Sequence, residues 1–316
     1  MPDKKIIAVF GATGAQGGGL VNAILNDANS EFAVRAVTRD VHSDKAKELA
    51  AKGAEVVEAD IDNVESIKKA LGGAYGAYFV TFYWAHFSPE KELAEVRNMV
   101  QAAKETGIKH AIWSTLEDTR QYIPLSDNRM PTLMEKYKVP HFDAKGESNH
   151  YFIEAGIPTT FLYTSFYWDN LIHFGMGPKR GEDGKLAITF PMGEQKLAGI
   201  AAEDIGKSAY GIFKKGEELI GKSVGIVGGH LSGKQMADSL SKALGEEVAY
   251  NAISPEVYRS FGFPGADDLG NMFQFYHDFA DSFNGRRSLE FTKEVNPSIK
   301  SFDEWLKENA QRIPLG

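Results

Sequence analysis

The sequence predicts an α/β protein built on a Rossmann-type, doubly wound parallel sheet, with a smaller, mainly helical C-terminal lobe. Short apolar runs alternate with amphipathic helical segments through the first half of the chain, which favours parallel strands joined by right-handed crossovers. The first apolar run leads directly into a glycine-rich turn that opens a helix. With 316 residues, 43% of them hydrophobic, the chain can bury a core for such a domain and a lobe.

The first half contains six expected strands and five expected helices. The strands are short apolar, β-branched runs, at residues 5–10, 32–38, 54–59, 75–81, 109–114 and 159–163. The helices have apolar residues at helical spacing, at residues 18–25, 44–51, 64–71, 89–106 and 141–155. Pro89 stands at the start of the longest helix and Gly107 at its end, as is common for helix termini.

The pattern changes after about residue 170. Residues 173–197 are rich in glycine, proline and charge, with one expected strand at 186–190, and further helices begin near residues 202, 232, 255 and 267. A capping-box sequence at Ser301 and Glu304 starts the last helix. We therefore predict a Rossmann domain in residues 1–165. Residues 166–316 form the lobe that covers the cleft, and part of this lobe returns to the sheet.

Composition excludes several classes of function. The chain has no cysteine, so disulfides, zinc–thiolate sites and a cysteine nucleophile are ruled out, and the histidine spacing predicts no metal site. The net charge of -8, without a dense basic cluster, argues against direct nucleic-acid binding. No apolar run is long enough to span a membrane, and residues 1–5 lack the features of a signal peptide. We expect a soluble monomer or homodimer in the cytoplasm, with the nucleus as an additional location.

The turn after the first strand has the spacing G-x-x-G-x-x-G at residues 11–17. Glycine lets the backbone turn tightly and approach a pyrophosphate, and the following helix offers free N–H groups to the phosphates. A tight turn without a ligand is the alternative, but the position in the first strand–helix turn of an α/β chain favours a nucleotide. The predicted contacts are Gly11, Thr13, Gly14, Ala15, Gln16 and Gly17.

The end of the second strand distinguishes NAD from NADP. An acidic residue there would accept from a ribose hydroxyl, whereas an arginine would bind a 2′-phosphate. Thr38 and Arg39 offer a small hydroxyl and a bidentate phosphate donor. Two alternatives stay open, in which Arg39 is a solvated surface charge or Asp40 is the carboxylate of an NAD site. The sequence favours NADP(H).

Later strand ends supply further candidates. Asp60 and Ile61 are placed beside the adenine, and Thr81, Phe82 and Tyr83 beside the ribose and nicotinamide. A helix cap at Asp60 and core packing of the aromatic residues are the alternatives.

The fifth strand and the helix after it add two more candidates. Ser114 ends that strand, and Lys145 on the helix could bind the nicotinamide ribose. The alternative for Lys145 is a lysine on the solvated helix surface.

The motifs taken together resemble the NmrA-like family of atypical short-chain dehydrogenases, and its redox-sensor members most closely. They are Gly-Ala-Thr-Gly-Ala-Gln-Gly-Gly, Val-Thr-Arg, Asp-Ile-Asp-Asn, His-Phe-Asp-Ala-Lys-Gly-Glu and the C-terminal Gly-Phe-Pro-Gly-Ala-Asp-Asp-Leu. The resemblance implies NADP(H) bound by the glycine-rich turn, Arg39, Thr81 and Lys145, with residues 164–167, including Ser165, Phe166 and Tyr167, closing over the nicotinamide. It also implies that the chain senses the supply of NADPH through protein partners.

The chain departs from active short-chain dehydrogenases at one position. Those enzymes use Tyr-x-x-x-Lys, in which the tyrosine is the general acid, and His141 stands where that tyrosine would be. Histidine can itself titrate near neutral pH, and Tyr83, Tyr163 or Tyr167 could approach from loops. The catalytic candidates are therefore Lys145, His141 and Ser114.

Three functions are open at this point, and the resemblance to the family favours the first. The missing tyrosine favours a redox-state regulator that acts through protein partners. The alternative is an NADPH-dependent reductase of quinones, enals or other small apolar substrates, because aromatic residues such as Phe82, Trp84 and residues 166–168 could line a cleft, although core packing would also explain them. A nucleotide-binding scaffold without signalling is the third interpretation.

Overall fold

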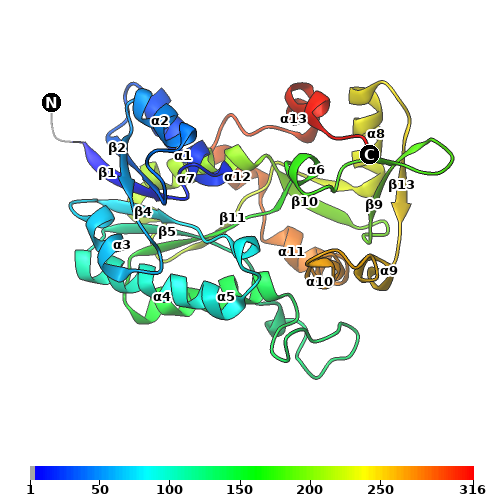
Figure 1. Cartoon of the computed structure of the whole chain (residues 1–316), viewed down its shortest axis with the longest axis horizontal. Coiled ribbons are helices and arrows are strands. Elements are labelled where there is room, and N and C mark those ends of the chain that lie inside the picture. Colours follow the sequence, from blue (N-terminus) through cyan, green and yellow to red (C-terminus); the bar gives the residue numbers. More distant parts are fainter. Residues whose placement is uncertain (1–3) are drawn as a thin grey trace.

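The computed structural model describes residues 4–316 and shows a large parallel sheet with helices on both faces (Figure 1). Residues 1–3, at the start of the N-terminal segment considered above, lie outside the described residues. The sheet has the strand order β11-β6-β5-β4-β1-β2-β3, and every neighbouring pair is parallel. Its strands are β1 (Lys5–Phe10), β2 (Phe32–Thr38), β3 (Glu55–Glu58), β4 (Gly76–Phe79), β5 (His110–Thr115), β6 (Thr159–Tyr163) and β11 (Ser223–Gly225). The predicted doubly wound parallel sheet is confirmed.

Helices cover both faces of this sheet (Figure 1). One face carries α1 (Ala15–Asn26), α2 (Asp44–Ala51), α7 (Ala202–Lys215) and α12 (Leu289–Val295). The other face carries α3 (Val64–Leu71), α4 (Pro89–Thr106) and α5 (Pro140–Glu154). All residues of the central strands β4 and β5 are buried, as expected for a parallel sheet that is covered on both sides.

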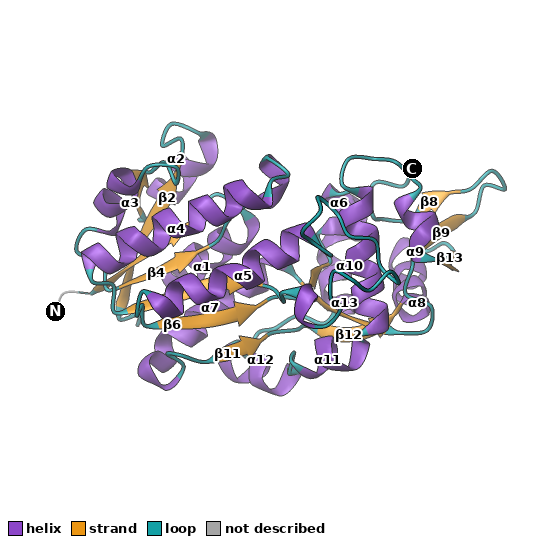
Figure 2. Ribbon diagram, turned by 90° about the horizontal axis from the view of Figure 1, so that it is seen from below, coloured by secondary structure: helices purple, strands orange, loops and turns teal. Residues whose placement is uncertain are grey.

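The C-terminal region lies beside the sheet and combines helices with two small sheets (Figure 2). The small sheets have the orders β12-β10-β7 and β13-β9-β8, with β7 (Phe166–Tyr167), β8 (Lys179–Arg180), β9 (Leu186–Phe190), β10 (Lys196–Ile200), β12 (Gly229–Ser232) and β13 (Val248–Ala252). The helices are α6 (Asn170–His173), α8 (Gly233–Leu244), α9 (Pro255–Arg259), α10 (Ala266–Asp278), α11 (Ala280–Gly285) and α13 (Phe302–Asn309). Short 3-10 turns are η1 (Tyr83–Ala85), η2 (Thr119–Gln121), η3 (Gly216–Glu218) and η4 (Ala310–Arg312).

The sequence prediction differs from this fold in two respects. Helix α1 begins at Ala15 rather than at Gly18. Glycine is a poor helix former, so we expected the helix to begin after the turn, but the last residues of the turn already form its first helical turn. Of the strands in the two small sheets, only β9 was predicted. We expected part of the C-terminal lobe to return to the sheet, and the second half of the chain supplies β11, α7 and α12 to the main sheet. Within residues 4–316, no helix has the length and apolarity that a membrane crossing requires.

Candidate cofactor and substrate site

The glycine-rich turn connects β1 to α1 at the carboxyl end of the sheet. Gly11 has φ +66°, a conformation that favours glycine, and an added Cβ would lie 2.9 Å from the Val80 side chain. The Gly14 N–H donates to the Gly11 carbonyl at 2.9 Å, and no side chain caps the N-terminus of α1. The first amides of α1 therefore lack an intrahelical acceptor and can receive an anion. This geometry fits the pyrophosphate of a dinucleotide.

A cavity opens in front of this turn, and we call it the glycine-turn cavity. The predicted cofactor residues along its wall are Gly11, Thr13, Gly14, Thr38, Arg39, Asp60, Ile61 and Phe82. The other residues along its wall are Phe10, Val37, Asp40, Ser43, Ala59, Asp62, Val80, Ala85, His86, Lys91 and Glu95. The ends of β1, β2, β3 and β4 thus meet at one ligand-sized space, as in other open parallel sheets.

Arg39 and Asp40 differ in how free their side chains are. Arg39 is exposed at the cavity wall, and its guanidinium makes no hydrogen bond or ion pair within residues 4–316. The Asp40 carboxylate already accepts the N–H of His42 at 2.8 Å. The free guanidinium suits a 2′-phosphate better than the engaged carboxylate suits a ribose hydroxyl. Asp60 likewise caps a turn, through the Asp62 N–H at 2.9 Å, while it lines the cavity.

A second space, the aromatic cavity, lies between the sheet and the C-terminal region. Predicted site residues on its wall are Gln16, Thr81, Phe82, Tyr83, His141, Lys145, Ser165, Phe166 and Tyr167. The remaining wall consists of Trp84, Leu116, Phe142, Thr164, Asn170, Phe174, Met176, Leu269, Met272 and Tyr276. Phe82 lines both cavities and is 58% exposed. The two cavities are therefore adjacent, with the phosphate-binding turn at one end and an aromatic wall at the other.

Gln16 connects the first helix to three strands beneath the aromatic cavity. Its Oε1 accepts the Tyr78 hydroxyl at 2.5 Å and the Ser114 hydroxyl at 2.8 Å. Its Nε2 donates to the Tyr167 hydroxyl at 2.5 Å. Burial raises the pKa of Tyr78 well above its usual range, so this phenol is a hydrogen-bond donor rather than an acid. Ser114 is not part of the cavity wall, and it reaches the site through Gln16.

Lys145 lies inside the site rather than on the solvated face of α5. Its ammonium group contacts Glu92 Oε1 at 2.5 Å and Thr81 Oγ1 at 2.6 Å. The Thr81 hydroxyl donates to the same carboxylate oxygen at 2.6 Å. Glu92 is fully buried, so the ion pair anchors Lys145 at the end of β4. The second carboxylate oxygen of Glu92, Oε2, has no hydrogen-bond partner within the described residues.

Helix α4 brings a second acidic residue to the glycine-turn cavity. Glu95 is 4% exposed, and its carboxylate lies 3.7 Å from both His86 and Lys91. Burial, reinforced by the charge of Glu92, raises the pKa of Glu95 to about 7. Two carboxyl groups three residues apart on the buried face of a helix are a signal that sequence analysis could have detected. We did not predict either of them.

His141 and Asp268 form a buried pair at the aromatic cavity. The distance from His141 Nδ1 to Asp268 Oδ1 is 2.5 Å, and Asp268 Oδ2 accepts the His141 backbone N–H at 3.3 Å. Both residues are about nine-tenths buried or more. The centroid of the His141 ring lies 4.8 Å from that of Trp84 and 4.7 Å from that of Phe142. Asp268 comes from α10 and was not predicted.

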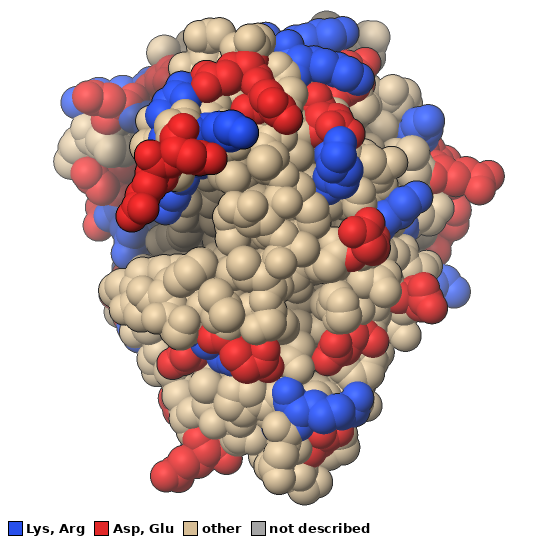
Figure 3. Space-filling model, turned by 90° about the vertical axis from the view of Figure 1, so that its right-hand side faces the viewer, with Lys and Arg blue, Asp and Glu red and all other residues tan. Residues whose placement is uncertain are grey.

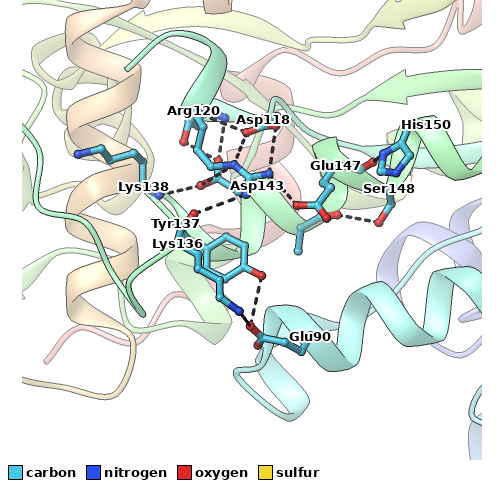
Figure 4. Close-up of polar contacts among 12 residues, drawn as sticks. Glu90, Asp118, Arg120, Lys136, Tyr137, Lys138, Asp143, Glu147, Ser148 and His150 are labelled. Carbon is cyan, nitrogen blue, oxygen red and sulfur yellow. Dashed lines mark hydrogen bonds and ion pairs between the residues drawn. The ribbon is translucent and has the colours of Figure 1, made fainter. Parts of the chain in front are cut away.

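The loop between β5 and α5 is fastened to the start of α5 by Asp143 (Figure 4). Its Oδ1 accepts the N–H of Thr119 at 2.7 Å, and its Oδ2 accepts the N–H of Lys138 at 2.8 Å. Asp143 is fully buried, and this burial raises its pKa to about 6 although the hydrogen bonds oppose the shift. Because Asp143 lies between His141 and Lys145 on α5, these contacts hold the helix turn that presents both side chains.

Four further predicted residues, namely Ser165, Phe166, Ala15 and Gly17, take part in the packing or the hydrogen bonds of the fold. The Ser165 hydroxyl donates to the Ile226 carbonyl at 2.6 Å, and Phe166 belongs to the C-terminal core. Ala15 and Gly17 form the first turn of α1 and do not line either cavity. Within residues 4–316, no three or more histidine, aspartate or glutamate side chains are arranged to hold a metal ion.

Comparison with known proteins identifies the family. Residues 3–306 match the NmrA-like family. The chain belongs to the NmrA-like family. Its motif resemblance to this family is thus confirmed. An NmrA-like family domain-containing protein of Dictyostelium discoideum is 27% identical, over 96% of this chain and 98% of that protein. An NAD(P)H azoreductase of Xenophilus azovorans is 29% identical, over 79% of this chain and 78% of the enzyme.

A solved structure shares the fold of this NmrA-like chain. The negative transcriptional regulator NmrA in complex with NADP superimposes with a TM-score of 0.77, at 24% identity, over 97% of this chain and 95% of the regulator. At this level of identity the likeness concerns the fold alone. The proteins that this chain resembles thus include a reductase by sequence and a regulator by fold.

Proposed function

We propose that this chain binds NADP(H) across the two cavities. The proposal rests on the glycine turn for the pyrophosphate, on the unpaired Arg39 for the 2′-phosphate, and on Thr81 and Lys145 for the nicotinamide ribose. NADPH would supply a hydride at the nicotinamide end when bound. Gln16, Ser165 and Tyr167 border the space for that ring.

We further propose that the chain is an NADP(H)-dependent reductase of small apolar acceptors such as quinones, enals or aromatic carbonyl compounds. The single observation that carries this proposal is the aromatic cavity, which continues the proposed nicotinamide site into a wall of Trp84, Phe142, Leu269 and Met272. Pockets of this kind, apolar with a few polar groups at one end, are the usual form of small-molecule sites. The name of the azoreductase relative supports the same class of reaction.

The test combines calorimetric titration with an activity screen. We expect NADPH to bind more tightly than NADH, and Arg39→Ala to weaken NADPH binding about 10- to 100-fold, which corresponds to one charge-assisted phosphate contact. NADH binding should not change, and Arg129→Ala, which removes an exposed arginine far from Arg39 in sequence, serves as control. Consumption of NADPH with at least one quinone or aromatic aldehyde is then expected, and a panel without any turnover would contradict the reductase.

A regulator that acts through protein partners is the second candidate, and exposed aromatic residues at the cavity mouth favour it. Phe82 is 58% exposed and Phe87 is 40% exposed, and they flank the η1 segment next to both cavities. A bound cofactor would contact Phe82, so a partner that recognises this segment could read cofactor occupancy. Figure 3 shows the end of the molecule that lies at the right in Figure 1, where acidic and basic side chains intermix around an uncharged area. A nucleic-acid interface would instead need a basic patch.

Hydrogen exchange of the segment from Phe82 to Phe87 tests the regulator. We expect its amides to exchange at different rates in the chain without cofactor, with NADP+ and with NADPH. Identical exchange rates in all three states, together with turnover in the activity screen, would contradict the regulator and support the reductase.

A further inference from the structure

The His141 ring is oriented by a carboxylate on one side and is free on the other. Asp268 contacts Nδ1 at 2.5 Å and also accepts the His141 backbone N–H. A carboxylate at Nδ1 keeps a proton on that nitrogen and directs Nε2 to the opposite side. Nε2 makes no hydrogen bond within residues 4–316, yet it is not sealed from solvent as the Nε2 of His86 is.

The free side of the ring belongs to the aromatic cavity. His141 and Lys145 are four residues apart on α5, which places both on one face of the helix, and both line that cavity. Trp84, Tyr83 and Phe142 surround the rest of the ring, with centroids 4.7 to 5.8 Å away. A molecule in the cavity is therefore the partner that Nε2 can reach.

The tyrosine hydroxyls on the cavity wall hold their protons firmly. The titratable groups that line this cavity or contact His141 come from η1, β7, α5 and α10, and they are Tyr83, Tyr167, Lys145, Asp268 and Tyr276. Burial raises the pKa of Tyr167 to about 12. Burial and the charge of Asp268 raise the pKa of Tyr83 far above its usual range. Lys145 donates to Glu92 and Thr81. A general acid works best when it can release its proton near neutral pH, and histidine is the residue type suited to that task.

We infer that His141, oriented by Asp268, is the proton donor in the reduction of a carbonyl or quinone substrate within the aromatic cavity; this inference rests on the reductase proposed above. The hydride of NADPH forms the new C–H bond, or O–H bond in a quinone, and the electron pair of the substrate π bond moves to an oxygen. The imidazolium Nε2–H gives its proton to that oxygen, which leaves a neutral imidazole that solvent protonates again. In sum, NADPH, one proton and the carbonyl compound become NADP+ and the alcohol, or the hydroquinone.

The first test compares the kinetics of variants of the full chain. We expect His141→Gln to lower kcat about 100-fold with little change in KM, which is the usual contribution of a general acid. Asp268→Asn keeps the shape of the carboxyl group but loses its charge, and it should lower kcat about tenfold or more. The matched control is His277→Gln, because His277 pairs with Asp278 at 2.9 Å on the surface. The variants Tyr83→Phe and Tyr167→Phe test the rival donors.

A binding experiment supplies a readout that does not need turnover. 4-Nitrophenol, added with NADP+, places an ionisable oxygen on an aromatic ring in the cavity. An imidazolium at His141 stabilises the phenolate, so the bound ligand should ionise at lower pH than the free one and show the yellow phenolate band. The shift should vanish in His141→Gln, shrink in Asp268→Asn and persist in His277→Gln.

The outcomes separate this inference from the reductase itself. If the wild-type chain reduces quinones or aldehydes and His141→Gln matches it in kcat and in the nitrophenol shift, the inference is overturned and the reductase stands. Loss of kcat only in Tyr83→Phe or Tyr167→Phe would also overturn it. If the wild-type chain reduces no acceptor, the reductase fails, and a nitrophenol shift that depends on His141 would still support a proton-donating group at this position.

Discussion

Glu95 is a carboxyl group that the fold buries beside the proposed cofactor site. Its side chain is 6% exposed on α4, near His86 and Lys91. Burial and the negative charge of Glu92 raise its pKa from 4.5 to about 7. Near neutral pH Glu95 is therefore partly protonated in the folded chain, whereas the same side chain is ionised in the unfolded chain.

This shift predicts how stability depends on pH. Between pH 4.5 and about 7 the folded chain binds a proton at Glu95 that the unfolded chain does not bind, so the free energy of unfolding falls as the pH rises through this range. Glu95→Gln removes the ionisable group. We expect the variant to be more stable than the wild type at pH 8, by as much as about 3 kcal/mol, and the difference to shrink at pH 5.

Urea titrations at pH 5 and pH 8 measure this effect. Glu105→Gln is the matched control, because Glu105 lies on the same helix but a hydrogen bond from Lys68 lowers its pKa. That control should not gain stability at pH 8. Equal pH dependence of unfolding in the wild type and in Glu95→Gln would contradict the prediction.

At the residue scale, the sequence could predict which side chains share a cavity where the relevant neighbours are local. Arg39 and the glycine turn could be assigned to one space, the glycine-turn cavity, because both directly follow strands, and strand ends converge in a parallel sheet. Asp268 could not be assigned, because it lies 127 residues from His141 and joins it only through packing of α10 against α5. A single sequence holds no local pattern for such a pair.

At the scale of elements, long periodic segments were predictable and short strands were not. The bounds expected for residues 89–106 agree with α4, and those for residues 32–38 agree with β2. Strand β11 has three residues and β7 has two, which is too short for an alternating pattern to be visible. Their pairing partners, β6 and β10, define them as strands.

Helices α1 and α7 pack closely because each presents a glycine to the other. A Cβ on Gly206 of α7 would lie 2.1 Å from the backbone nitrogen of Leu20 and 2.4 Å from the carbonyl oxygen of Gln16. A Cβ on Gly19 of α1 would lie 2.2 Å from the carbonyl oxygen of Glu203. These are backbone atoms, which cannot move aside as a flexible side chain would. The crossing therefore depends on the absence of side chains at both positions.

We expect Gly206→Ala to destabilise the chain by about 1 to 3 kcal/mol, because the added methyl group pushes α7 away from α1. Helix α1 carries Gln16, so the substitution should also weaken NADPH binding. Thermal unfolding and calorimetric titration measure the two effects.

The control for this substitution is a helical glycine without close neighbours. Gly285, at the end of α11, has no atom within 4 Å of an added Cβ, so Gly285→Ala should be neutral or slightly stabilising through its higher helix propensity. An equally small effect of both substitutions would show that α1 and α7 can separate without cost.

At the scale of the whole molecule, segments from the second half of the sequence pack against the main sheet that the first half builds. Helix α7, from the second half, covers α1 and one face of the main sheet, and its Phe213 ring lies 6.2 Å from that of Phe32 on β2. Arg287 forms a fully buried ion pair with Glu117, at 2.7 and 3.0 Å, and donates to the Thr164 carbonyl at the aromatic cavity. The C-terminal segments thus complete both the core and the site.

This arrangement predicts that residues 1–165 do not fold alone, although they contain most of the sheet. Without α7, the fragment would expose Phe32 and the apolar face of α1, including Leu20 and Val21, which are buried in the whole chain. A large exposed apolar patch on a parallel sheet leads to aggregation. We expect the fragment to be insoluble or to unfold without a cooperative transition. Coexpression with residues 166–316 should restore a soluble complex that binds NADPH. A monomeric fragment 1–165 that melts cooperatively would instead mean that the sheet is stable without α7, β11 and α12, and that the boundary at residue 165 separates two independent domains.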